Sequence, residues 1–116
     1  MNQLLKLPKI YSDLLDQVYE IEKKVVALTE QHTISRNILR LKEIFENMED
    51  DGGLIYHNPL GETYRDTRTD VDATIAGTSA EDLIITEVIK PIIRYKKGGT
   101  SVIARKGIVV VESKKK

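Results

Sequence analysis

The chain has 116 residues, of which 41% are hydrophobic and 31% charged, with equal numbers of basic and acidic side chains. This balance excludes a disordered chain and allows one domain with a modest core. The sequence has no cysteine, which excludes a disulfide framework and thiolate chemistry, and no apolar run approaches the ~20 residues of a membrane span. Residues 1–9 lack the apolar region of a secretory signal, so we expect a cytoplasmic protein that does not enter a membrane.

Charge is unevenly distributed along the chain. Residues 83–116 carry nine Lys or Arg and two Asp or Glu, whereas residues 51–82 carry two and seven. A basic C-terminal part predicts a face that meets an acidic partner. The final run of lysines, residues 114–116, is equally well explained as a solubilising tail.

The first half of the chain has a helical pattern from Tyr11 or Ser12 to about Met48. Glycine and proline are absent between Lys9 and Asp51, and apolar residues recur at alternating steps of four and three. This heptad spacing is typical of a coiled-coil seam. The first seam comprises Leu14, Val18, Ile21, Val25 and Leu28. The second begins at Ile34 or Ile38 and continues through Leu41, Phe45 and Met48.

The two seams are out of register, since Leu28 and Ile38 are ten residues apart where unbroken heptads would give eleven. We therefore expect a break or change of phase near His32 and Thr33. Ser12 is a candidate cap for the first helical segment, and Thr33 for the second.

A heptad seam with no partner of its own length inside the chain predicts a parallel homodimer. The alternative is a helix that folds back onto its own sheet. The narrow seam argues against this alternative, because a helix packed on a sheet usually has a wider apolar stripe.

Residues 51–116 have the pattern of a small β-domain. The helix is expected to stop at Gly52-Gly53, and short strands follow at residues 54–57 and 71–75. Two longer runs, residues 83–95 and 101–111, are dense in β-branched side chains and are joined by a turn at Gly98-Gly99.

The first of these long runs contains Pro91 and the second contains Gly107. Proline cannot donate to a sheet ladder, so we expect an edge, a bend or a bulge at Pro91, and Gly107 predicts a bulge in the return strand. Strict alternation would place one set of side chains on a single face, namely Leu83, Ile85, Ile89, Ile93 and Tyr95.

The sequence therefore predicts an α+β protein in two parts. Residues 1–50 would form a long dimerising helix, a coiled coil broken near His32-Thr33. Residues 51–116 would form a compact all-β domain that folds by itself and ends in a hairpin and a basic tail.

Chemistry-bearing motifs are not found in the sequence. No glycine-rich phosphate loop precedes a helix, and there is no nucleophile motif or His–carboxylate cluster. The acidic run containing Asp66, Asp70 and Asp72 lacks the order and the closing Glu of a Ca²⁺ loop. Neither His32 nor His57 has a second metal ligand at a usable spacing. We expect a binding module without a catalytic residue, cofactor or metal rather than an enzyme.

Four short motifs, in order, are similar to those of a known family. Residues 44–48 followed by Gly52–Ile55 resemble a bundle helix entering a first strand. Asn58–Tyr64 resembles a Pro-x-Gly-x-x-Phe turn, with Tyr64 for the usual Phe. Thr86–Val88 with Tyr95, and then Val102–Val109 with its Arg105, resemble the last two strands. Between Ile38 and Val111 the chain resembles GrpE, the nucleotide exchange factor of DnaK-type chaperones.

The chain departs from the family pattern at several positions. Arg65-Asp66 and residues 69–71 replace the usual Asp-Pro and His-Glu-Ala, Arg94 replaces the Gly before Tyr95, and Lys106-Gly107 replaces a small pair. The N-terminal helix is also short for this family.

The resemblance implies a co-chaperone whose β-domain binds the nucleotide-binding domain of a DnaK-type chaperone. By favouring the open cleft of that domain it would lower the affinity for ADP. The resemblance itself suggests Arg105 as a contact, and Arg94, Lys96, Lys97 and Lys106 are added on the basis of charge alone.

Two alternatives remain open at this point. The first is a coiled-coil adaptor whose β-domain grips another protein. The second is a nucleic-acid-binding module that uses the basic hairpin, which is less favoured because only Tyr95 lies nearby to stack on bases.

Overall fold

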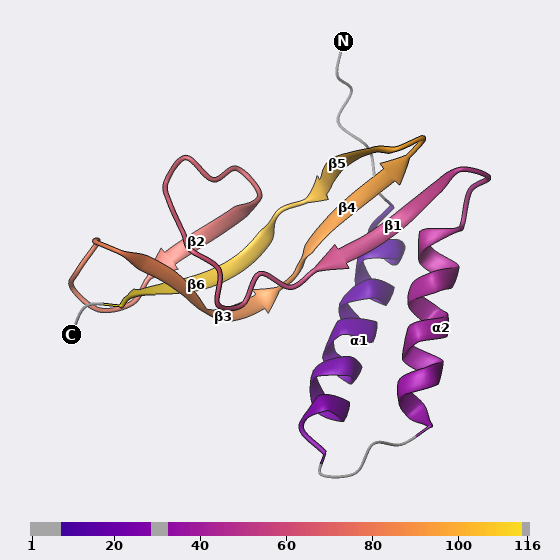
Figure 1. The fold of residues 1–116 in the computed structure, drawn as a ribbon, viewed down its shortest axis with the longest axis horizontal. Helices are drawn as coiled ribbons and strands as arrows, with labels where there is room; N and C mark the ends of the chain where they lie inside the picture. Colours follow the sequence, from indigo (N-terminus) through magenta and orange to yellow (C-terminus); the bar gives the residue numbers. More distant parts are fainter. Residues whose placement is uncertain (1–7, 29–32, 115–116) are drawn as a thin grey trace.

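The computed structural model describes residues 8–28 and 33–114, which contain two helices followed by six strands (Figure 1). Helix α1 spans Lys9–Val26 and helix α2 spans Ile34–Glu46. The strands are β1 (Gly52–His57), β2 (Val71–Ile75), β3 (Leu83–Lys90), β4 (Ile92–Lys97), β5 (Thr100–Arg105) and β6 (Gly107–Ser113). The expected strands at residues 54–57 and 71–75 are confirmed as β1 and β2.

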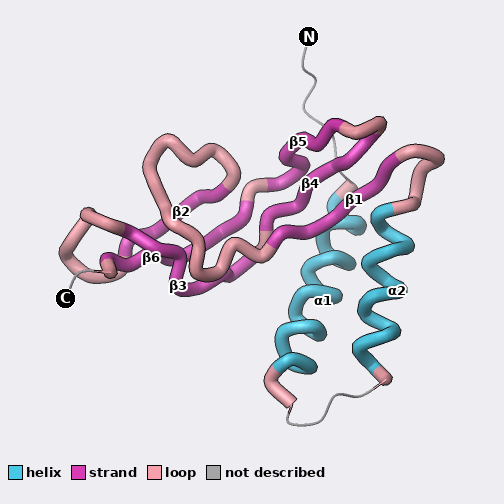
Figure 2. Tube along the Cα trace, in the orientation of Figure 1, coloured by secondary structure: helices cyan, strands magenta, loops and turns pink. Residues whose placement is uncertain are grey.

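The prediction of one long dimerising helix is wrong. Helices α1 and α2 run in opposite directions and lie side by side as a short antiparallel hairpin, as Figures 1 and 2 show. Val18 and Ile38, which were expected in an intermolecular seam, are only 5% and 4% exposed within this single chain. The change of heptad phase marked the reversal, but a seam pattern does not reveal whether the second helix comes from the same chain.

The expected helix caps are only partly observed. Ser12 lies inside α1, where its hydroxyl donates to the carbonyl of Lys9 at 2.9 Å, so it does not cap the helix. Thr33 does stand immediately before α2, but it makes no side-chain capping hydrogen bond. His32 lies outside the described residues.

Strands β3 and β4 and the returning strands β5 and β6 form one long β-hairpin. This long β-hairpin bends and contributes to two sheets. The first sheet has the order β1-β4-β5 and is antiparallel. In the second, with the order β2-β6-β3, β2 runs parallel to β6 and β3 antiparallel to it. The bend falls between β3 and β4 at Pro91, and between β5 and β6 at Lys106. The interruption expected at Pro91 is thus confirmed as the corner where one sheet gives way to the other. The bulge expected at Gly107 is not observed, because Gly107 begins β6 and the break before it falls at Lys106.

Strict alternation along residues 83–95 is wrong for Ile89. The pairing of β3 with β6 shifts between Ile85 and Glu87 and again between Val88 and Lys90. Each irregularity moves the following side chains to the opposite face. Val88 is therefore buried, whereas Ile89 is 49% exposed.

The buried side chains form two clusters, and α1 contributes to both. Leu15 packs with Leu54 of β1 and Ile93 of β4 in one cluster. Tyr19 packs in the other cluster with Ile92 of β4 and with residues of the second sheet, namely Val71, Leu83, Ile85, Val88, Val109 and Val111. Leu15 and Tyr19 are four residues apart and therefore lie on the same side of the helix. The helices and the β-domain expected at residues 51–116 thus share their cores.

A polar contact fixes α1, α2 and β1 to one another. The Tyr56 hydroxyl donates to Glu22 Oε1 at 2.5 Å, and Lys42 Nζ lies 3.2 Å from Glu22 Oε2. The Lys42 ammonium also stands 5.0 Å from the centroid of the Tyr56 ring, within cation–π range. Burial and then the hydrogen bond to Glu22 raise the pKa of the Tyr56 phenol, which keeps the hydroxyl available as a donor.

The molecule is flatter and more extended than a typical chain of this length. Its dimensions are 48 × 46 × 23 Å and its radius of gyration is 15.7 Å, where roughly 13 Å is usual for this length. Figure 1 shows the reason, since the helical hairpin projects beyond the first sheet. Much of the hairpin surface consequently remains uncovered.

Gly53 gives a test of the packing between α2 and β1. A Cβ at this position would stand 2.1 Å from the Phe45 carbonyl oxygen and 2.4 Å from that of Glu46. Since both obstacles are backbone atoms, we predict that Gly53→Ala destabilises the protein by about 2–3 kcal/mol. Urea unfolding followed by circular dichroism measures this, and an unchanged midpoint would show that β1 does not approach the end of α2 so closely.

Candidate protein-interaction surfaces

Arg105, the contact suggested by the family resemblance, is engaged inside the molecule. Its guanidinium makes two bonds of 2.8 Å to the carboxylate of Asp16 on α1, and a third of 2.8 Å to the carbonyl of Pro91. The side chains of Arg105 and Asp16 are only 23% and 16% exposed. Arg105 therefore links α1 to the corner of the long β-hairpin at Pro91, and its role in this structure is structural.

Arg94 is also engaged, in a network that holds residues 58–70 against the two sheets. Its Nη2 lies 3.1 Å from Asp70 and 3.4 Å from Nδ1 of His57. Because Arg94 donates to Nδ1 of His57, the ring proton is on Nε2. This Nε2–H donates to the Glu62 carboxylate at 2.6 Å. Arg68 completes the network by bonding both Glu62 and Asp70. The network joins β1, the following loop, β2 and β4.

The carboxylates of this network are stabilised in their charged forms. The hydrogen bond from Arg68 holds the pKa of Asp70 below its ordinary value, against the opposing effect of burial. Burial alone would raise the pKa of Glu62, but the hydrogen bonds from His57 and Arg68 outweigh it and lower that pKa. Sequence reasoning considered His57 and Asp70 for metal binding but did not predict this network, because charged residues scattered through a loop give no signal of which ones will meet.

The three lysines expected to contact a partner are paired but remain about half exposed. Lys96 lies 3.1 Å from Glu46, Lys97 lies 3.7 Å from Glu49, and Lys106 lies 3.8 Å from Asp72. Their side chains are 45%, 55% and 52% exposed. Lys96 and Lys97 lie beside the turn between β4 and β5, whereas Lys106 follows the other end of β5, so the structure does not unite the five basic residues into one patch.

The helical hairpin carries an exposed apolar stripe on each helix. On α1 and immediately after it, Leu14, Ile21 and Leu28 are 47%, 44% and 49% exposed. At the start of α2, along it and beyond its end, Ile34, Leu41 and Met48 are 43%, 40% and 41% exposed. The members of each set are seven residues apart, close to two helical turns, so each set forms one line along its helix.

The stripe on α1 is offset from the side of the helix that faces the sheets. Leu14 precedes the sheet-facing Leu15 by one residue, which is a rotation of about 100° around the helix. Val18 and Ile38 are buried but belong to neither sheet cluster, which places them in the seam between the helices. Of the residues expected at a dimer interface, Leu14, Ile21, Leu28, Leu41 and Met48 are thus exposed. Val18 and Ile38 are used internally, and Val25 and Phe45 are half-buried.

Other kinds of site are not evident in the parts of the chain that the structure describes. No three His, Asp or Glu side chains in residues 8–28 and 33–114 are grouped as metal ligands. Neither described helix has the length and apolar content required to cross a lipid bilayer. Comparisons of the chain with protein-family models, curated proteins and solved structures found no match.

We predict that Arg105→Ala destabilises the fold rather than removing a surface contact. The substitution leaves Asp16 partly buried without its partner, and we expect a loss of about 2–3 kcal/mol in the free energy of unfolding. Lys106→Ala is the matched control. The Lys106 side chain follows Arg105 in the sequence and is half exposed, so its removal should change the free energy of unfolding by less than ~0.5 kcal/mol. Equal free energies of unfolding for the two variants in urea would argue against a structural role for the contacts of Arg105 with Asp16 and Pro91.

The loop network predicts sensitivity to acid. The pKa values of Asp70 and Glu62 are lowered by folding from ordinary values of 3.8 and 4.5, so the stability they add is present above about pH 4.5. It is lost as the pH falls through their lowered folded values. Arg68→Met should therefore lose less stability than the native chain between pH 6 and pH 3. Arg65→Met, in the same loop, should behave like the native chain in urea unfolding at both pH values.

Proposed function

We propose that the chain is a dimeric, GrpE-like co-chaperone of the cytoplasm that promotes ADP release from a DnaK-type chaperone. The observation that carries the protein-binding part of this proposal is the pair of apolar stripes on the helical hairpin. Single exposed apolar side chains are ordinary, but six of them in two lines on one helical hairpin mark an interaction surface.

The stripes favour a second copy of the chain as their occupant. Two amphipathic hairpins that face each other bury four apolar stripes in a four-helix bundle, and heptad spacing suits the small crossing angle of such a bundle. This dimer differs from a parallel two-stranded coiled coil, since each copy contributes two antiparallel helices.

The order of the parts supports the exchange function. A helical region followed by a compact β-domain is the arrangement implied by the resemblance to GrpE between Ile38 and Val111. In this proposal the dimer presents the β-domain to the chaperone. Binding that is tighter to the open than to the closed nucleotide cleft then lowers the affinity for ADP by the same factor.

The contact with the chaperone is proposed at the tip of the hairpin between β4 and β5. Lys96 and Lys97 lie there, about half exposed, and Val102 on β5 is 52% exposed. A basic rim around an exposed apolar residue is a plausible complement to an acidic surface. Arg94 and Arg105 are not proposed as contacts, because their guanidinium groups bond Asp70 and Asp16.

The exchange activity is tested by the release of labelled ADP from a DnaK-type chaperone of the same organism. We expect the native chain to accelerate release at least tenfold, and Lys96→Glu with Lys97→Glu to abolish most of this acceleration. Lys9→Glu with Lys24→Glu, on exposed positions of α1, is the matched charge reversal and should retain it. If the native chain binds the chaperone without accelerating release, or does not bind it, the chain is an adaptor for another protein.

The dimer is tested separately by light scattering at micromolar concentration. We predict a dimer mass for the native chain and a monomer mass for Ile21→Glu with Leu41→Glu. Leu39→Glu is the control, because Leu39 is 58% exposed but lies roughly 160° around α2 from Leu41. A monomeric native chain would exclude the bundle and leave the stripes for a different partner.

A further inference from the structure

One edge of the second sheet is open in the described structure. β2 pairs with β6 on one side, and no strand within residues 8–28 and 33–114 pairs with its other side. No backbone or side-chain hydrogen bond among those residues reaches the main chain of Val71, Ala73 or Ile75 from that side. By contrast, the outer edge of β3 is covered, because Gly61 and Tyr64 donate their amides to the carbonyls of Ile85 and Leu83.

The pairing with β6 determines which groups of β2 are available. The Asp70 carbonyl accepts from the amide of Gly107 at 3.0 Å, and the Ala76 amide donates to the carbonyl of Val111 at 2.9 Å. In a parallel ladder alternate residues bond to the same neighbour, so the even-numbered residues from 70 to 76 bond to β6. The amides and carbonyls of residues 71, 73 and 75 therefore point toward the open edge, at a repeat of roughly 6.6 Å.

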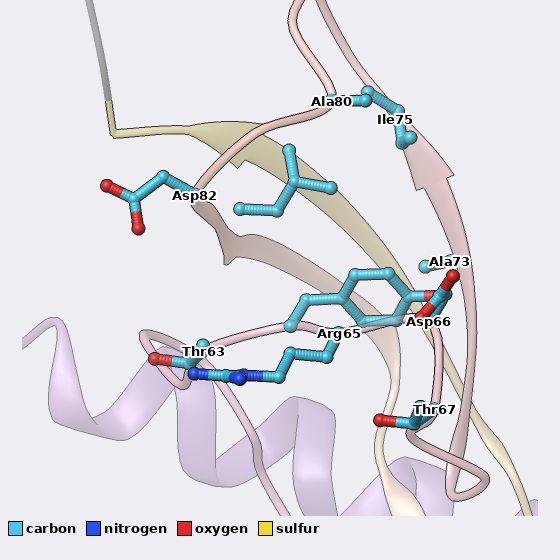
Figure 3. Close-up of a pocket in the computed structure, with 10 residues that line it drawn as sticks. Thr63, Arg65, Asp66, Thr67, Ala73, Ile75, Ala80 and Asp82 are labelled. Carbon is cyan, nitrogen blue, oxygen red and sulfur yellow. The ribbon is translucent and has the colours of Figure 1, made fainter.

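A hollow of about 690 Å³ adjoins this edge. Its lining includes five apolar side chains, those of Tyr64, Ala73, Ile75, Ala80 and Leu83. Figure 3 shows Ala73 and Ile75 on one side of the hollow, with Thr63 and Asp82 on the other. Ala73 and Ile75 thus contribute side chains to the hollow and main-chain groups to the open edge.

We propose that this edge and hollow bind an extended segment of a partner protein by β-strand addition. The main chain of the segment pairs with residues 71, 73 and 75, and one apolar side chain enters the hollow. An extended polypeptide is the occupant favoured by the edge, because its own amides and carbonyls repeat at the same spacing. This site lies on the second sheet and is independent of the exchange function proposed above.

The surrounding charges favour a basic segment. Asp66 and Asp82 line the hollow together with Arg65, and Asp72 is on β2 with its side chain 70% exposed. Lys106 is the cation facing Asp72, at 3.8 Å, which is too long for a strong ion pair. Acidic groups thus outnumber basic ones, and a Lys or Arg next to the apolar residue of the segment would be attracted.

Amide hydrogen exchange of the free, full-length chain provides the first test. The amides of Asp72, Thr74 and Ala76 should be protected, whereas those of Val71, Ala73 and Ile75 should exchange at least a hundredfold faster. If both sets are equally protected, the edge is already covered in solution, by a second copy or by another part of the chain, and the proposal fails.

Peptide binding provides the second test, with a phage-displayed library of random ten-residue peptides selected on the full-length chain. We expect selected peptides to have a basic residue beside an apolar one, and to protect the amides of residues 71, 73 and 75. Synthetic copies of these peptides carry N-methyl groups on either the odd-numbered or the even-numbered residues. The set whose methyl groups replace the amides that pair with β2 should bind at least tenfold more weakly. The other set should bind like the unmodified peptide. No selected peptide, or peptides unaffected by N-methylation, would overturn strand addition.

Two variants test the location. Ala80→Trp fills the hollow from an exposed loop and should weaken peptide binding at least tenfold, whereas Thr78→Trp, on the same loop but outside the hollow, should not. Ala73→Pro removes an amide that faces the open edge and no bond to β6, as proline in edge strands does. It should also weaken binding tenfold, and circular dichroism confirms that it folds. Native affinity in both Ala80→Trp and Ala73→Pro would place the peptide elsewhere and refute the site.

Discussion

The contacts of Arg105 with Asp16 and the Pro91 carbonyl, at the corner of the long β-hairpin, connect the helices, the first sheet and the second sheet. The strands that begin in one sheet continue in the other only because the chain bends at Pro91 and Lys106. At that bend the Pro91 carbonyl accepts a bond from Arg105, which also holds Asp16 of α1. A Cβ on Gly107 would stand 3.0 Å from the side chain of Ile92 and 3.1 Å from the carbonyl of Lys90. The corner therefore needs a residue without a side chain at position 107, together with a cation that bonds the carbonyl of the buried Pro91.

The position of the helices follows from this junction. Once Asp16 is fixed, Leu15 and Tyr19 of the same helix enter the two clusters, one on each side of the corner. Contacts from Tyr56 and Lys42 to Glu22 then hold α2 beside α1. The remaining apolar side chains of both helices cannot also reach the sheets, because a helix turns only one side toward a flat surface. The stripes proposed as a dimer interface are among the apolar side chains that this packing leaves exposed.

The folded structure gives a different explanation for the uneven distribution of charge along the sequence. The basic C-terminal third and the acidic middle of the sequence were expected to indicate an acidic partner. In the structure the basic residues of β4 and β5 pair with the acidic residues of α1, α2 and the loop before β2. Much of the asymmetry is therefore neutralised within the molecule, which leaves apolar stripes and an open strand edge as the prominent interaction features.

The sequence by itself determined the local elements. The positions of β1 and β2, the bend at Pro91 and the break in the helical region are consequences of backbone preferences and short-range periodicity. These depend on near neighbours in the chain. The sequence also identified the apolar seams, since heptad spacing is a property of one helix alone.

Only the tertiary structure decided what each seam and each charge contacts. A heptad pattern records that an apolar partner exists, not whether it is a second chain, a second helix or a sheet, which is why Val18 and Ile38 were assigned to a dimer. Arg105 and Asp16 are 89 residues apart, and no local signal pairs them. The irregular register of β3, which buries Val88 and exposes Ile89, depends on its fit to β6. Long-range pairings of this kind are selected by the packing of the whole chain, because each contributes little until the others have formed.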